Sequence, residues 1–110
     1  MPGVRVVVYI DAAGRSAFTR WFAELNPEAA AKVTTALYRM GQGNFSNVEG
    51  VGGGAFEYRI DFGPGYRVYF GKDGETLVVL LGGSTKKRQQ RAILAARESW
   101  KEYKHRKAHD

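Results

Sequence analysis

The order of apolar and polar positions along the chain predicts an α+β domain. Val4–Ile10 is an apolar, β-branched run that is typical of a mostly buried first strand. Two helices are expected next, as a helical hairpin, one from Ser16 and a second from Asn26 to about Met40. In the second helix Asn26 is a suitable N-cap, a proline follows it in the first turn, and Gly41 is expected to end the helix.

A glycine-rich loop and a β-hairpin are predicted for the middle of the chain. Gly41–Gly54 contains six glycines and no strong periodicity, so we expect a loop with a short extended piece around Phe45–Val51. Ala55–Phe62 and Tyr66–Gly71 each alternate between apolar and polar positions, as strands with one buried face do. The Gly-Pro-Gly segment 63–65 lies between them and predicts the turn.

A third strand and a last helix complete the predicted domain. Asp73-Gly74 indicates a two-residue hairpin turn, and Leu77–Leu81 is continuously aliphatic, as expected of a central strand covered on both faces. Thr85 is expected to cap the last helix. The residues in register on that helix are Ile93, Leu94, Arg97, Trp100 and Lys104. One domain over residues 1–110 is therefore predicted, with an N-terminal strand, a helical hairpin, a three-stranded antiparallel meander and a C-terminal helix.

The outward face of the predicted hairpin carries the first candidate functional side chains. If a three-residue turn joins the two strands, Asp61 lies opposite Arg67. Arg59 then lies opposite Tyr69, and Glu57 shares their face. Arginine is suited to binding phosphate through its planar fork, and tyrosine can stack on a base or transfer a proton. The alternative is structural, with an Asp61–Arg67 salt bridge and the other side chains covering an exposed surface.

Charge changes this picture because the excess lies at one end of the sequence. The net charge is +6; residues 1–85 hold eight Lys/Arg and eight Asp/Glu, whereas residues 86–110 hold nine and three. A basic cluster begins the last helix at Lys86, Lys87, Arg88 and Arg91. Cations at a helix N-terminus oppose the macrodipole, so a polyanionic partner would relieve both this and their mutual repulsion. The alternative is a solvated basic helix.

Residue types also limit the possible functions. The chain has no cysteine, which excludes disulfides and thiolate metal sites and fits a reducing compartment. No apolar run approaches the roughly 18 residues that cross a membrane, so a cytoplasmic location is expected. Phosphate-loop and dinucleotide motifs are missing, and Ser84 lies in no nucleophile elbow. His105 and His109 lie in the basic tail without metal-ligand spacing, so no metal or other cofactor is expected.

Several segments together resemble a known family. They are Phe18-x-x-Trp21-x-x-x-Leu25, Gly41-Gln42-Gly43-Asn44-Phe45, Gly54-x-x-Glu57-Tyr58-Arg59-Ile60-Asp61-Phe62-Gly63-Pro64-Gly65-Tyr66-Arg67-Val68-Tyr69-Phe70, and Leu80-Leu81-Gly82-Gly83 followed by Thr85-Lys86-Lys87-Arg88-Gln89-Gln90. Over about residues 18–104 the chain resembles the HigB-like branch of the RelE/ParE toxin superfamily, which includes phage-derived addiction module killer proteins. Similar sequences carry an acidic residue where this chain has Ala92.

The resemblance implies the toxin of a bacterial type II toxin–antitoxin module. It implies a RelE/ParE-like fold and an mRNA endoribonuclease that needs no metal and in many members works on the translating ribosome. The implied partners are mRNA and a cognate antitoxin, expected to be of helix-turn-helix type. Two alternatives stay open: a ParE-type inhibitor of DNA gyrase without catalysis, and an inactive relative that only binds nucleic acid or an antitoxin.

The resemblance also implies roles for individual residues. Arg67 matches the arginine that contacts the scissile phosphate in the RNA-cleaving branch. Lys86 and Lys87 fall where that branch has a second cation. Strand geometry adds Arg59, Tyr69 and Glu57 as catalytic candidates, with the general base left open between a Lys, a Tyr and Glu57. The residues expected to bind RNA are Arg88, Arg91, Lys101 and Lys104.

Overall fold

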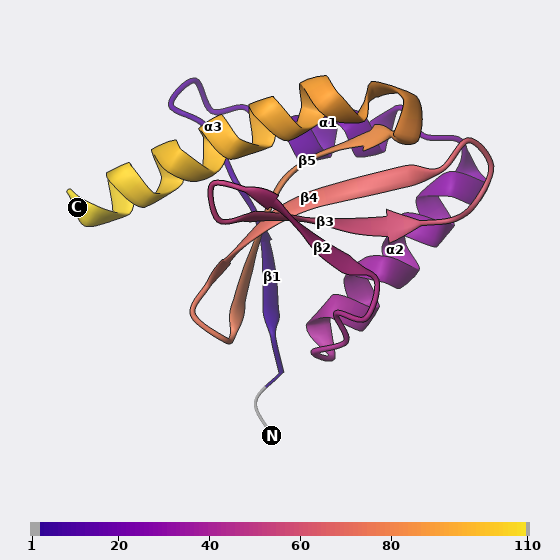
Figure 1. Cartoon of the computed structure of the whole chain (residues 1–110), viewed down its shortest axis with the longest axis horizontal. Coiled ribbons are helices and arrows are strands. Elements are labelled where there is room, and N and C mark those ends of the chain that lie inside the picture. The colour runs from indigo at the N-terminus through magenta and orange to yellow at the C-terminus, as the bar shows by residue number, and fades with distance from the viewer. Residues whose placement is uncertain (1–2, 110) are drawn as a thin grey trace.

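The computed structural model describes residues 3–109. They fold into a five-stranded mixed sheet with helices on both faces (Figure 1). In chain order the elements are β1 (Arg5–Val8), α1 (Ala17–Ala23), α2 (Pro27–Gly41), β2 (Val48–Gly52), β3 (Ala55–Ile60), β4 (Tyr66–Asp73), β5 (Leu77–Thr85), the short 3₁₀ helix η1 (Lys86–Arg88) and α3 (Gln89–Ala108). The strands lie in the order β1-β5-β4-β3-β2, with β1 parallel to β5 and the other pairs antiparallel. The predicted α+β class is confirmed.

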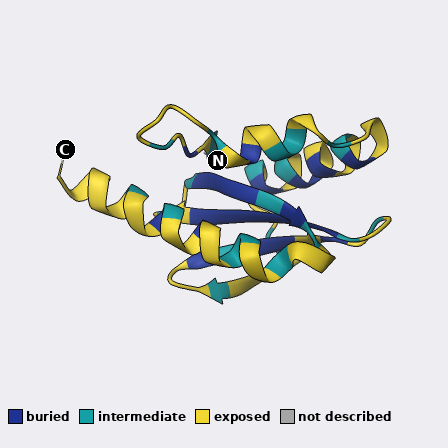
Figure 2. Cartoon of the chain, turned by 90° about the horizontal axis from the view of Figure 1, so that it is seen from above, coloured by how far each residue is buried: buried dark blue, intermediate teal, exposed yellow. Residues whose placement is uncertain are grey.

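The sheet separates two hydrophobic cores. Figure 2 shows α1 and α2 on one side of the sheet and α3 on the other. The first core holds the inward positions of the predicted alternation, such as Tyr58 and Val68, against α1 and α2. The second holds Tyr69 against Ala96 and Trp100 of α3. The face predicted to be exposed is therefore largely covered by the last helix.

Small residues let each helix layer approach the sheet. A Cβ atom on Gly71 of β4 would overlap the ring of Trp100, and one on Gly83 of β5 would overlap the ring of Trp21. These two tryptophans come from α3 and α1, so each face of the sheet has one indole seated on a glycine. The close contact fixes the height of α3 above the candidate site.

The predicted starts of the first two helices are confirmed, and the predicted end of the second is wrong. The side chains of Ser16 and Asn26 accept hydrogen bonds from backbone amides three residues on, as N-caps do. The second helix includes Gly41 and ends at the C-cap Gln42. Gly41 keeps its helical place while its carbonyl accepts a hydrogen bond from the amide of Val4 (3.0 Å), which ties α2 to the start of β1.

The edges of the sheet differ from the prediction. The short extended piece expected within the loop is a full edge strand, β2, which pairs with β3 through a turn at Gly52–Gly54 whose glycines all have positive φ. Edge position leaves β2 mostly exposed, so its sequence shows little alternation. The first strand is also an edge, with Val8 38% and Ile10 51% exposed, because only β5 covers it. The prediction that the first strand is mostly buried is therefore wrong.

Three details of the C-terminal third also correct the prediction. The β4–β5 connection has three residues, 74–76, because Asp73 pairs with Leu77 and not with an earlier residue. Thr85 makes no side-chain cap, since the chain first enters η1. Leu94 is 62% exposed, because α3 turns its neighbours at Ala96 and Trp100 toward the sheet. Leu77–Leu81 does lie in the interior of the sheet, between β1 and β4.

The far end of α3 is fixed to the β4–β5 hairpin by hydrogen bonds and an ion pair to Asp73. Asp73 accepts hydrogen bonds from the Tyr103 hydroxyl (2.6 Å) and from Lys107 Nζ (2.6 Å). The hydrogen bonds from Lys107 and Tyr103 lower the pKa of Asp73, and the bond to Asp73 raises the pKa of Tyr103 to about 12.

Among the helices over residues 3–109, none combines the length and apolar character needed to cross a membrane.

Candidate functional site

The candidate side chains meet where η1 and the start of α3 lie above the β3–β4 turn, at one end of the sheet (Figure 1). Arg59 is opposite Arg67, and Glu57 is opposite Tyr69. The predicted pairing is therefore wrong by two residues. The connection is longer than three residues because Phe62 and Gly65 make hydrogen bonds inside it. A shift of two residues keeps each side chain on its face, so the group stays together.

Arg67 is a buried cation without an acidic partner. It is 5% exposed, and its Nη1 donates a hydrogen bond to the carbonyl oxygen of Tyr66 (3.0 Å). Its Nε is buried and has no hydrogen-bond partner within residues 3–109. None of the ion pairs in that range includes it. Burying such a group is costly unless an anion or acceptor compensates it, so this guanidinium is prepared to bind one.

Lys86 lies next to Arg67 because the turn brings both to Gly65. The amide of Lys86 donates to the carbonyl oxygen of Gly65 (3.0 Å), which fixes the start of η1 to the turn. A Cβ atom on Gly65 would lie 3.3 Å from Lys86 Cβ and 3.7 Å from Arg67 Nη1. Gly65 has φ +81°, so a glycine suits both its backbone and the space around it. Lys87 follows on η1 and is exposed, as Lys86 is.

Arg59 faces acidic side chains and is largely neutralised. Its Nη2 pairs with Glu49 of β2, and its Nε pairs with Glu57 (3.3 Å). Glu57 itself is 2% exposed and also accepts hydrogen bonds from Gln89 Nε2 at 3.0 Å and 3.3 Å. The buried carboxylate thus links β3 to the first residue of α3.

Tyr69 is completely buried beneath α3. Its hydroxyl and that of Ser84 are 3.0 Å apart, and Ser84 Oγ donates to the carbonyl oxygen of Thr85 (2.9 Å). Since a serine has one hydroxyl proton, the Tyr69 hydroxyl is the donor to Ser84. Burial raises the pKa of Tyr69 above its usual value; the Ser84 hydrogen bond lowers it, the charge of Glu57 raises it, and that of Arg67 lowers it.

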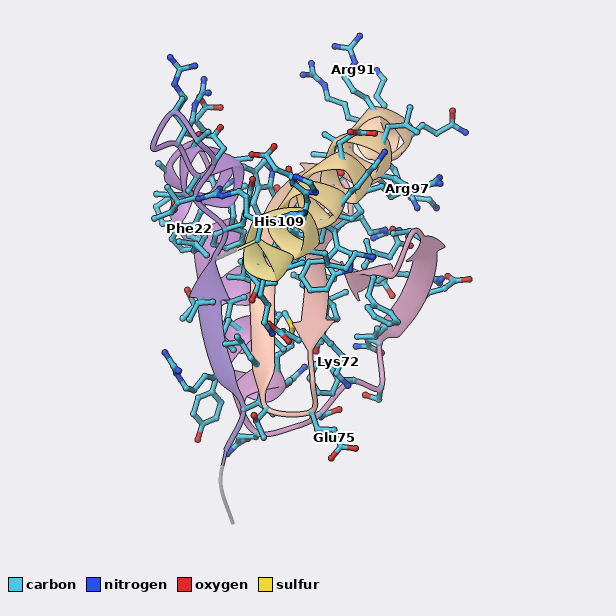
Figure 3. All side chains as sticks on the ribbon, turned by 90° about the vertical axis from the view of Figure 1, so that its left-hand side faces the viewer. Phe22, Lys72, Glu75, Arg91, Arg97 and His109 are labelled. Carbon is cyan, nitrogen blue, oxygen red and sulfur yellow. The ribbon has the colours of Figure 1, made fainter. Side chains whose placement is uncertain are left out.

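The residues expected to bind RNA separate into two groups along α3. Arg88 and Arg91 lie at the end of α3 near Arg67, and Figure 3 shows Arg91 extending away from the helix. Lys101 and Lys104 lie in the second half of α3; Lys104 Nζ is 5.9 Å from the centre of the Trp100 ring. All four are exposed. At 1.5 Å of rise per residue, Lys104 lies roughly 24 Å along the axis from Arg88, so only the first group borders the candidate site.

Sequence reasoning missed two polar residues of the site. The sequence around Ser84 excludes a nucleophile elbow but does not indicate its contact with Tyr69, and Gln89 stands out only as part of a family motif. Gln89 contacts a carboxylate 32 residues earlier in the chain, which no local pattern reveals. Arg97, predicted only to share a register with Trp100, reaches over the β2–β3 turn against Gly52 and Gly53 (Figure 3).

The hollows found over the described residues are not lined by Arg67. One of about 500 Å³ lies between β1 and the end of α3 and is lined by Tyr9, Tyr103 and Arg106 among others. A smaller one of about 250 Å³ lies between α2 and β3 and includes Arg59 but not Arg67. Residues 3–109 contain no group of three or more His, Asp or Glu side chains placed to hold a metal ion. The chemistry of an unpaired cation makes Arg67 the better centre for the candidate site.

Comparison with known proteins relates the chain to one bacterial protein. No protein-family model matches the sequence. The chain is 41% identical over 81 residues to an uncharacterized protein of Haemophilus influenzae, an alignment that covers 73% of this chain and 82% of that protein. At this identity and coverage, the chain belongs to the same family as the Haemophilus influenzae protein.

Proposed function

We propose that the protein is the toxin of a type II toxin–antitoxin module and acts as a metal-independent endoribonuclease on mRNA, with a RelE/ParE-like arrangement of its sheet and helices. The observation that carries the proposal is Arg67, a buried guanidinium without an acidic partner and with an unpaired Nε. Lys86 adds a second cation at the same turn. Two adjacent cations without carboxylates of their own suit a phosphate group.

The proposed reaction is attack of a ribose 2′-oxygen on the adjacent phosphorus. A bond from the 2′-oxygen to phosphorus forms, the bond to the 5′-oxygen breaks, and the products are a 2′,3′-cyclic phosphate and a 5′-hydroxyl end. The 2′-hydroxyl loses a proton and the leaving oxygen gains one. Arg67 and Lys86, with Lys87 next in the chain, stabilise the negative charge that develops on the phosphate oxygens. Electrostatics and substrate positioning would supply most of the rate.

The surrounding basic residues fit a role in holding the RNA strand. Arg88 and Arg91 are exposed beside the cation pair and would contact neighbouring phosphates. The proposed protein partner is an antitoxin of helix-turn-helix type, which would cover the same basic surface with acidic or apolar segments. Cytoplasmic mRNA, alone or on the ribosome, is the proposed substrate.

Replacement of Arg67 tests the proposal. Arg67→Ala should reduce RNA cleavage by about 10²–10³-fold, because it removes a donor to the transition-state charge. The measurement is growth after induction without a partner, together with mapping of RNA 5′ ends in total RNA. Arg20→Ala is the matched control, since Arg20 is exposed on α1, across the sheet from the site.

The same induction experiment separates the competing functions. New RNA ends that disappear in Arg67→Ala support the proposal. Growth arrest with DNA-damage signalling and intact RNA would identify a gyrase inhibitor instead. Normal growth with the wild-type chain would identify an inactive relative, and unchanged arrest by a folded Arg67→Ala variant would reject the role of Arg67.

A further inference from the structure

We infer that Tyr69 and Glu57 are positioning residues that hold the basic turn, Lys86–Arg88, at its two ends and do not transfer protons themselves. The effects that this inference predicts on RNA cleavage rest on the proposed ribonuclease function. Its predicted effects on the stability of the turn do not, because they concern contacts within the chain.

The first end of the basic turn is held through Ser84. Tyr69 donates to Ser84 Oγ (3.0 Å), and Ser84 donates to the carbonyl oxygen of Thr85 (2.9 Å). Thr85 immediately precedes Lys86, whose amide donates to Gly65. The directed chain of hydrogen bonds therefore starts at a fully buried tyrosine and ends on the peptide group that carries Lys86 into the site.

The second end is held through Gln89. Its Nε2 donates to both carboxylate oxygens of Glu57 (3.0 Å and 3.3 Å). Gln89 immediately follows Arg88, and Glu57 is 2% exposed on the neighbouring strand β3. A hydrogen bond to a buried carboxylate is among the stronger polar contacts in proteins, so it fixes the last residue of the turn.

The two anchors form one unit. Glu57 and Tyr69 are directly opposite each other in the β3–β4 ladder, so their side chains rise side by side from the sheet. The turn that they support has three successive cations at a helix start and no side-chain cap. The macrodipole and like-charge repulsion both disfavour this arrangement, which explains why it needs anchors in the sheet.

Burial and hydrogen bonding argue against proton transfer by these two residues. Tyr69 has no exposed surface, and its single hydroxyl proton is directed at Ser84. Both oxygens of Glu57 already accept hydrogen bonds, from Gln89 and Arg59. A general base must reach the proton that it removes, and neither group has a free path to an RNA bound above the turn.

Hydrogen exchange of backbone amides gives a test that does not depend on activity. Tyr69→Phe and Gln89→Ala each remove one anchor, so exchange at the amides of residues 86–89 should rise about tenfold, the change that matches loss of one buried hydrogen bond. Exchange in the second half of α3, held by Asp73 and Tyr103, should stay unchanged. The controls are Tyr38→Phe and Gln90→Ala, which change exposed residues of the same types. Unchanged exchange at residues 86–89 in both anchor variants would overturn the inference.

Kinetics of RNA cleavage supply the second readout. Tyr69→Phe should lower kcat about tenfold with an unaltered pH–rate profile, and the Tyr69→Phe/Ser84→Ala double variant should lose little more, because both break the same chain. Glu57→Gln keeps an acceptor for Gln89, so it should retain about ten times the activity of Glu57→Ala. Equal loss in the two Glu57 variants, with one limb of the pH–rate profile removed, would instead make Glu57 the general base. If the wild-type chain cuts no RNA, the proposed function fails while the exchange data still decide whether the anchors exist.

Discussion

Arg59 and Arg67 are the same residue type on the same face, directly opposite each other in the β3–β4 ladder, yet their surroundings differ completely. The Arg59 side chain is 43% exposed and pairs with two carboxylates. Arg67 is 5% exposed and pairs with none among the described residues. Side-chain type and strand alternation therefore do not decide which arginine can meet a phosphate; the neighbouring strands do.

The register of the neighbouring strands β2 and β5 decides which side chains lie beside each arginine. On one side, β2 sets Glu49 opposite Glu57, so two carboxylates lie beside Arg59 at the sheet edge. On the other side, β5 sets the neutral Ser84 opposite Arg67, so that strand brings no carboxylate to it. The Arg59–Glu49 pair is exposed and contributes about 1 kcal/mol or less, and the Arg59–Glu57 pair compensates a buried carboxylate, whereas burial of an uncompensated Arg67 costs stability. This contrast makes Arg59 a structural residue and Arg67 the functional candidate.

The largest effect that would test this contrast is expected for Arg67→Met. Methionine keeps the volume of the aliphatic stem but removes the charge, so RNA cleavage should fall about 10²-fold or more. The free energy of unfolding should rise by about 1 kcal/mol, because an uncompensated buried charge has been removed. Urea denaturation measures the second quantity, with the wild-type chain as reference. A loss of stability by more than about 1 kcal/mol would show that Arg67 serves the fold instead.

A smaller effect of opposite sign is expected for Arg59→Met. The change leaves Glu49 and Glu57 without their cation, so the free energy of unfolding should fall by about 0.5–1 kcal/mol. RNA cleavage should stay within about threefold of the wild type, since less than 1 kcal/mol of transition-state binding is at stake. Denaturation and cleavage assays on the same preparations decide the matter. Cleavage reduced as far as in the Arg67 variant would end the distinction between the two arginines.

The sequence predicts that the two arginines share a face of the sheet, but it does not predict the neighbours that make their surroundings different. The alternation of apolar and polar residues predicts both arginines on one face of the sheet. This prediction is correct although the predicted register is wrong by two residues, because a shift of two residues keeps each side chain on the same face. The register itself depended on hydrogen bonds within residues 60–65, which no pattern of residue types announces. The short extended piece predicted around Phe45–Val51 is present as β2, but an exposed edge strand with several glycines has little alternation, so its pairing with β3 and the contact of Glu49 with Arg59 were not predicted.

The covering of this face of the sheet by α3 was not predicted, for a different reason. A charged helix start suggested solvent, whereas the packing of Trp100 on Gly71 brings α3 down onto the sheet. That contact joins residues 29 positions apart and depends on a missing Cβ atom, so it is a property of the pair and not of either segment. The predicted exposure of Tyr69 was wrong for the same reason.

The smallest and most specific effect should come from Glu49→Gln, which releases one partner of Arg59 without touching Arg67. RNA binding should then depend more steeply on salt, with the slope of log Kd against log salt increasing by up to about 1, because Arg59 becomes available to a phosphate. The measurement uses a single-stranded RNA and the Arg67→Ala background, in which the RNA stays uncut. Glu24→Gln, at the C-cap of α1, makes the same change in net charge on the other face of the sheet and should leave the slope at the background value. Equal slopes in the two variants would mean that Arg59 lies off the RNA path, and that Glu49 holds it for the stability of the sheet edge alone.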